Sequence, residues 1–173
     1  MAVRTIADSM SLPRYRAAVG RVRSYIASGD VYQVNFAHRL RAEGSFDARS
    51  LYLRMRRNRA PFSGYLRTGT DAILSNSPEL LVRSDGRRVL TRPMKGTRPR
   101  GRTPREDRAL ERELLRSPKD RAELLMIVDL ERNDLGRICR TGSVRVPRLR
   151  RIERYPTVFQ TTADVEGTLL PGT

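Results

Sequence analysis

The chain has 173 residues, 38% of them hydrophobic, which suits one domain with a packed core. Its 35 lysine and arginine residues outnumber its 19 acidic residues, and a net charge of +16 is typical of nucleic-acid binders. However, the arginines are spread along the whole chain instead of clustering, and only 6% of the residues are aromatic and could stack on bases, so nucleic-acid binding is disfavoured. The charge fits attraction of a small polyanionic substrate better.

The sequence contains no run of 18 apolar residues and no signal-peptide pattern. Its one cysteine, Cys139, is expected to be a buried thiol and agrees with a reducing compartment. We therefore expect a cytoplasmic protein with neither a membrane nor a nucleic acid as its partner. One domain over residues 1–173 is the simplest organisation, because no linker or repeat is visible.

The first predicted elements are a helix and a strand. Apolar residues at helical spacing predict a helix from Leu12 to Ser28, with Gly29 just past its end. Residues 31–41 then alternate with period two, which predicts a half-buried strand. Its apolar face would contain Tyr32, Val34, Phe36 and Leu40. The lone histidine, His38, lies on this face and is expected to be a packed core side chain.

Further elements follow in separate runs. Residues 62–68 and 71–76 are predicted strands, and Asp85-Gly86 between two apolar runs predicts a hairpin turn. Capping signals at Thr103 and Ser117 predict helices over residues 104–116 and from 118 to about 138. Strands are expected again after Gly142 and over residues 157–166. The order favours an α+β fold with a largely antiparallel sheet.

The chemistry candidates begin with Lys95, which stands just after the predicted hairpin. Only Lys95 and Lys119 are lysines in this arginine-rich chain. A lysine can lose its proton when it is partly buried among other cations, and its amine then acts as a nucleophile or base, whereas arginine cannot. The alternative is a solvated loop charge.

Three acidic residues are further candidates. Glu79 lies just ahead of the hairpin, where it could protonate a leaving hydroxyl, although it could also be merely exposed. Asp120 and Glu123 share one helical face, and two carboxylates on one face can hold Mg²⁺. Acidic residues in a first helical turn also stabilise the helix dipole without any metal. A third set is expected to form caps and salt bridges: Asp129, Arg132, Asn133 and Asp134.

Six segments together resemble the chorismate-binding enzymes, and within them most closely the aminating component of aminodeoxychorismate synthase. The segments are GDVYQVN (29–35), APFSGYLR (60–67), SPELL (77–81), TRPMKGTRPRG (91–101), KDRAELLMIVDLERNDLGRIC (119–139) and GSVRVP (142–147). Their order and spacing also match. The resemblance covers most of residues 12–168 and implies large, mainly antiparallel sheets flanked by helices.

The resemblance also implies an activity, the conversion of chorismate to 4-amino-4-deoxychorismate for folate synthesis. Lys95 would add to C2 of the ring while Glu79, as general acid, assists loss of the C4 hydroxyl. Ammonia from a glutamine amidotransferase subunit would then add at C4 and expel the lysine. Related branches that make anthranilate or salicylate resemble P-x-A-G-T where this chain has Pro93-Met94-Lys95-Gly96-Thr97.

The remaining site residues follow from the same resemblance. Glu123 would be a Mg²⁺ ligand with Asp120 as a secondary one, and Thr97 and Gly96 would belong to the substrate-binding loop. Gln160 stands where much of the family has a histidine that contacts substrate; it can donate a hydrogen bond but cannot carry a proton. Ala163 and Asp164 replace the small hydroxyl residues that are usual nearby.

The family extends beyond both ends of this sequence, so we expect a fragment that exposes strand edges and apolar surface. The alternatives are anthranilate-type or isochorismate-type chemistry, and a non-catalytic basic binding module.

Overall fold

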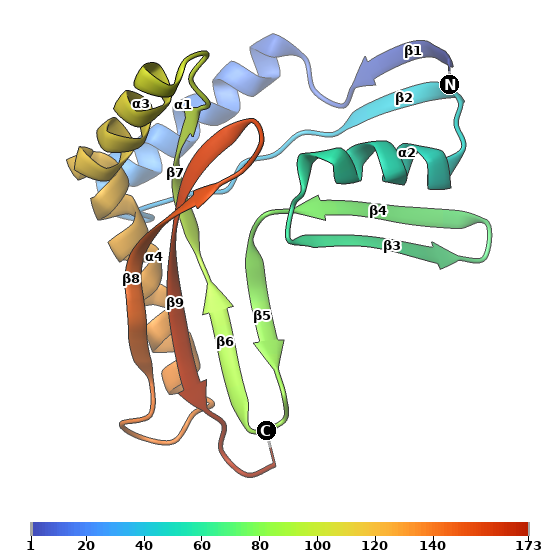
Figure 1. Cartoon of the computed structure of the whole chain (residues 1–173). Helices are drawn as coiled ribbons and strands as arrows, with labels where there is room; N and C mark the ends of the chain where they lie inside the picture. Colours follow the sequence, from blue (N-terminus) through green and yellow to red (C-terminus); the bar gives the residue numbers. More distant parts are fainter. Residues whose placement is uncertain (1, 173) are drawn as a thin grey trace. The chain divides into compact units, whose positions relative to one another are not determined.

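The computed structural model describes residues 2–172, and Figure 1 shows their helices and strands. The chain divides into two compact units, one ending at Ala48 and the other beginning at Arg49. Antiparallel strand pairs and helices make up both units, which confirms the predicted α+β class. None of the helices among these residues is long and apolar enough to cross a membrane.

The first unit pairs two strands and carries one long helix. Strand β1 (Ala2–Asp8) runs antiparallel to β2 (Leu40–Ser45). Helix α1 (Leu12–Ser28) has the predicted bounds and ends at Gly29, whose φ of 82° is the left-handed conformation that glycine adopts without strain. Ala18 is the buried residue of this helix. The strand β1 was not predicted, because its partner lies some 40 residues away along the chain.

The strand predicted over residues 31–41 is wrong. Residues 31–39 form no strand in the structure, and β2 begins only at Leu40. Apolar residues of the predicted inward face are exposed, with 62% of Tyr32 and 63% of Leu40 accessible. Alternation predicts a strand only where a partner strand is present, and within the described part of the chain residues 31–39 pair with no strand.

His38 is likewise not a core residue, because 41% of its side chain is exposed. Its Nδ1 lies 2.8 Å from Oδ1 of Asp8, at the end of β1. This carboxylate hydrogen bond lowers the pKa of Asp8 despite a smaller opposing effect of burial. The imidazole is thus held by a polar contact at the surface, with the ring of Tyr15 6.2 Å away.

Helix α2 (Ala48–Met55) starts at the boundary between the units and leads into the short 3-10 helix η1 (Arg56–Asn58) of the second unit. A hairpin of β3 (Phe62–Thr68) and β4 (Asp71–Ser77) follows, in register from Phe62↔Ser77 to Thr68↔Asp71. Both strands were predicted, β4 one residue shorter than observed. Helix α2 was not predicted.

A five-stranded antiparallel sheet forms the centre of this unit (Figure 1). Its strands are β5 (Leu80–Ser84), β6 (Arg88–Arg92), β7 (Met94–Pro99), β8 (Arg145–Arg154) and β9 (Val158–Thr168). Strand β9 pairs with β6, β7 and β8, whereas β5 pairs with β6. The predicted Asp85-Gly86 turn joins β5 to β6, with Gly86 at φ 84°.

Helices α3 (Pro104–Arg116) and α4 (Pro118–Gly136) pack against this sheet. Each begins at the predicted cap, since Thr103 accepts from Glu106 N–H and Ser117 accepts from Asp120 N–H. Helix α4 ends two residues earlier than expected. The core between α4 and the sheet consists of Val89, Leu124, Val128, Leu135, Cys139, Ala163, Val165 and Leu169. The buried Cys139 thiol confirms its prediction, and burial raises its pKa.

Many large apolar residues are exposed, as expected from the sequence. Leu81 of β5 is 83% exposed, and Ile6 of β1 and Ile73 of β4 are 69% and 59% exposed. Such apolar area on strands is a surface suited to packing against further protein.

Candidate functional site

Lys95 lies in β7, half-buried and directly paired with Thr161 of β9. The pairing shifts between Lys95 and Thr97, so Gly96 is the extra residue of a β-bulge. The Thr161 hydroxyl, which is fully buried, donates a hydrogen bond to the Lys95 carbonyl. The lysine predicted as nucleophile therefore stands on a bulged strand whose backbone is fixed from its neighbour, not on a free loop.

Gly96 is required here by both conformation and space. Its φ is 78°, and an added Cβ would lie 2.9 Å from Asp120 Cβ and 2.9 Å from Leu114 Cδ1. Real Cβ atoms do not approach other atoms so closely, so any side chain would push the bulge away from α3 and α4. The close approach brings Lys95 next to the start of α4.

Glu79 is placed beside the lysine by the hairpin. It lies between β4 and β5, and the register Leu80↔Arg92 carries it to the position just beyond β6. Its Oε1 accepts a hydrogen bond of 2.9 Å from the Met94 N–H, the residue before Lys95. Across the hairpin, the carboxylate of Glu79 thus reaches the backbone of the residue that precedes Lys95.

A third residue of this region, Glu131 of α4, was not predicted. It accepts a hydrogen bond from the Thr91 hydroxyl of β6. Burial raises the pKa of Glu131 against the lowering effect of that hydrogen bond, and the charges of Glu79 and Asp134 raise it further. Glu131 stands two helical turns after Glu123, and this eight-residue spacing is the signal that could have identified it.

Thr97 and Gln160, the predicted substrate-binding pair, are also brought together. They face each other directly in the β7–β9 register, one position after the bulge. Gln160 Nε2 donates to Thr97 Oγ1 over 3.3 Å. The Gln160 amide therefore donates to a hydroxyl on the neighbouring strand.

Asp120 and Glu123, the predicted metal ligands, have different surroundings. Asp120 is buried, and its Oδ2 accepts from Arg98 Nη2 at 3.0 Å. Burial acts to raise the pKa of Asp120, but the Ser117 hydrogen bond and the Arg98 charge outweigh it and lower that pKa. Glu123 is 43% exposed, and its Oε1 lies 3.8 Å from the Lys119 ammonium.

These contacts decide how well Mg²⁺ fits. Within residues 2–172 no group of three or more acidic, histidine or cysteine side chains is arranged to hold a metal. Mg²⁺ is commonly held by one or two carboxylates together with water and substrate oxygens. Glu123 fits as one such ligand because its carboxylate is accessible. The Asp120 carboxylate, in contrast, already forms an ion pair with Arg98.

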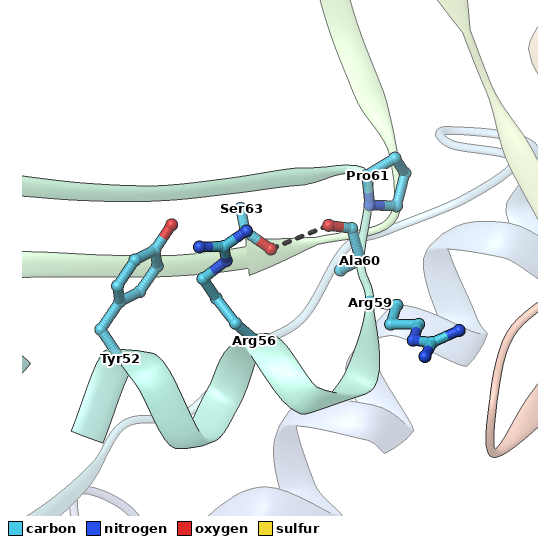
Figure 2. A pocket seen from close by; sticks show the side chains of 6 residues that line it. All are labelled: Tyr52, Arg56, Arg59, Ala60, Pro61 and Ser63. Atoms are coloured by element: carbon cyan, nitrogen blue, oxygen red, sulfur yellow. Dashed lines mark hydrogen bonds between the residues drawn. The ribbon is translucent and has the colours of Figure 1, made fainter. Parts of the chain in front are cut away.

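The predicted cap and salt-bridge cluster on α4 contains one ion pair, in which Arg132 Nη1 lies 2.9 Å from Asp129 Oδ1. A separate cavity of about 280 Å³ lies at the end of α2 (Figure 2). Figure 2 shows Ser63 donating to the Ala60 carbonyl, over 2.8 Å, beside the guanidinium of Arg56. This pocket contains none of the predicted site residues.

The comparisons with known proteins agree with these motifs. The family model described as chorismate binding enzyme matches residues 1–173. Aminodeoxychorismate synthase component 1 of Bacillus subtilis is 46% identical over 91% of this chain and 34% of its own length. Anthranilate synthase component 1 of Thermus thermophilus is 45% identical over 91% of this chain and 34% of its own length.

Solved structures give the same result. The anthranilate synthase component I of Streptococcus pneumoniae superposes with a TM-score of 0.86 at 31% identity, over 99% of this chain and 38% of that chain. The menaquinone-specific isochorismate synthase of Escherichia coli has a TM-score of 0.66 at 15% identity, over 97% of this chain and 40% of that one, and shows the fold alone. The chain thus spans about a third of its curated relatives, and it belongs to the chorismate-binding enzyme family.

Proposed function

We propose that the chain is part of an enzyme that aminates chorismate to 4-amino-4-deoxychorismate, a step toward folate. The observation that carries this proposal is the 2.9 Å hydrogen bond from the N–H of Met94, the residue before Lys95, to the carboxylate of Glu79. An amine that can act as nucleophile and a carboxyl group that can act as acid are the groups that a covalent displacement of a hydroxyl requires. Relatives in Bacillus subtilis and Escherichia coli with this activity in their names support it.

The chemistry divides one difficult displacement into two steps. The neutral Lys95 amine forms a bond to C2 of the ring, the ring double bonds shift, and the C4–oxygen bond breaks as Glu79 donates a proton and water leaves. Ammonia then forms a bond to C4, the double bonds shift back, and the lysine leaves C2. The sum is chorismate plus ammonia giving aminodeoxychorismate plus water.

Mg²⁺ would be held by Glu123 together with oxygens of the substrate, with Asp120 nearby. Bound there, it would neutralise a substrate carboxylate and help to fix the ring's orientation. Thr97, Gly96 and Gln160 would contact the substrate at the edge of the bulge. We also infer that ammonia comes from a glutamine amidotransferase subunit and that the enzyme works in the cytoplasm.

Anthranilate synthesis is the second candidate, because a Thermus thermophilus anthranilate synthase is 45% identical to this chain. In that reaction ammonia itself would bond to C2 as the C4 hydroxyl leaves as water, and pyruvate would then be released, so no lysine nucleophile is needed. The two candidates therefore differ in their product and in their dependence on Lys95.

The test is product analysis with chorismate, Mg²⁺ and ammonium, using the chain alone and the chain mixed with the remaining segment of a longer relative. We expect aminodeoxychorismate, and its loss in Lys95→Ala and in Lys95→Arg, which keeps the charge but has no nucleophilic amine. Anthranilate and pyruvate formed equally by wild type and Lys95→Ala would contradict the amination proposal.

A further inference from the structure

The backbone around Lys95 is held at three successive residues, Lys95, Gly96 and Thr97. The buried Thr161 hydroxyl donates to the Lys95 carbonyl. At Gly96 the chain approaches Asp120 so closely that a Cβ would lie 2.9 Å from its Cβ. The Thr97 carbonyl accepts a 2.9 Å hydrogen bond from Arg98 Nη1. A bulge is the most easily deformed part of a strand, and here each side of it is fixed.

Arg98 connects this bulge to both helices. Its Nε lies 2.7 Å from Glu113 Oε1 of α3, and its Nη2 lies 3.0 Å from Asp120 Oδ2 of α4. With Nη1 on the Thr97 carbonyl, one planar guanidinium spans a strand and two helices. Only arginine has donors in such a fork, so lysine could not replace it. Glu113 and Asp120 together raise the pKa of Arg98, with burial acting against them.

Asp120 is the buried partner in this contact. Its side chain is 11% exposed, whereas that of Glu113 is 60% exposed. An ionised carboxylate so far removed from water needs a partner, and Arg98 supplies it. Recruiting the same carboxylate to a cation would leave the Arg98 guanidinium with the exposed Glu113 as its remaining ionic partner. The neighbouring Glu123 is accessible and requires no such exchange.

We infer that Asp120 is a positioning residue, which fixes the Gly96 bulge and hence the Lys95 backbone through Arg98, and that Glu123 alone of the two carboxylates is available to a cation. The inference rests on the proposed function only in taking Lys95 as the reacting amine. This role of Asp120 explains why a buried carboxylate lies directly against Gly96.

The test uses the fact that the chain has only two lysines, so amine-selective acylation followed by peptide mass spectrometry reports on both. Lys119 is 82% exposed and serves as the internal reference. In Asp120→Asn we expect the Lys95-to-Lys119 labelling ratio to rise about threefold or more, because a released bulge exposes the half-buried lysine and a charge-assisted hydrogen bond is lost.

The matched control is Glu123→Gln, which changes the carboxylate 3.8 Å from Lys119 but does not touch the Arg98 contacts. Its ratio should stay within about twofold of wild type. Should Asp120→Asn fold poorly, Glu113→Gln removes the other, exposed partner of Arg98 and should raise the ratio by a smaller factor. Combining Arg98→Gln with Asp120→Asn should add nothing to the larger single effect, since both act on one contact. Independent, additive effects would overturn the inference, as would an unchanged ratio in folded Asp120→Asn.

Metal affinity separates the two roles of the carboxylates. With Mn²⁺ as the probe in titration calorimetry of protein saturated with chorismate, Asp120→Asn should bind like wild type, and Glu123→Gln should bind about tenfold or more weakly. Equal losses in both variants would make Asp120 a ligand and overturn the inference. Labelling needs neither metal nor chorismate, so failure of the amination proposal would not be mistaken for failure here.

Discussion

The two units of the chain differ in how their elements are held. In the unit from Arg49 onward, two helices cover a five-stranded sheet, and residues such as Phe159, Leu114 and Val165 are fully buried. In the unit up to Ala48, the residues of β2 are all exposed and Ala18 is the buried residue of α1. Every predicted site residue lies in the well-packed unit from Arg49 onward. Functional side chains need a rigid support, and the packed core of this unit can supply it.

The largest difference in stability between the two units is expected when a core side chain is truncated. Phe159→Ala should lower the free energy of unfolding of its unit by about 3 to 5 kcal/mol, since it removes a fully buried ring. The matched change in the other unit is Tyr15→Ala, whose ring is 42% exposed and should cost under about 1 kcal/mol. Urea unfolding, monitored through the hydrogen exchange of each unit, measures both changes in the free energy of unfolding. Similar losses would mean that the units do not differ as described.

Two glycine substitutions sharpen the comparison. Gly96→Ala should destabilise by about 2 to 4 kcal/mol, because the new Cβ clashes with Asp120 and Leu114 and φ is positive. Gly20→Ala in α1 has nothing within 4 Å of the new Cβ and should stabilise its helix by up to about 1 kcal/mol. Thermal melting distinguishes the two signs. A neutral Gly96→Ala would show that the bulge adapts, and would remove the basis of the close approach.

Acid should weaken the sheet-bearing unit through Asp107. The hydrogen bond from Arg100 lowers the pKa of Asp107 from 3.8 to about 2, with burial acting the other way. A carboxyl group with a depressed folded pKa stabilises the fold above about pH 4, and that contribution is lost as pH falls toward 2. The urea midpoint of wild type should therefore fall across this range more than that of Asp107→Asn. Parallel acid profiles would contradict the role of this ion pair.

The smallest effect is expected from the surface pair in the first unit. Asp8 and His38 are both 41% exposed, and exposed ion pairs contribute little. Asp8→Asn should leave the urea midpoint of that unit unchanged within error at pH 7. A clear loss would show that this contact, and not the packing of α1, holds the unit together.

The sequence predicted local features well because their signals are local. Helix α1 and its Gly29 cap, the Thr103 and Ser117 caps and the Asp85-Gly86 turn each depend on a few neighbouring residues. The motif at Lys95 was found by resemblance.

Features that depend on distant partners were missed. Residues 31–39 alternate like a strand but have no partner, and β1 was missed although it has one. The approach of Glu79 to Met94 requires the β5–β6 register, and the contact of Arg98 with Asp120 joins residues 22 positions apart. Such contacts follow from the packing of helices on the sheet, which no short sequence window contains.

The most direct test of the central claim is peptide mass spectrometry of the chain after incubation with chorismate and Mg²⁺ but no ammonia. A covalent adduct with the mass of chorismate less one water is predicted on the peptide that contains Lys95, and it should disappear in Lys95→Arg and diminish in Glu79→Gln. Consumption of chorismate with Lys95 unmodified, or an adduct of equal yield on Lys119, would contradict the account.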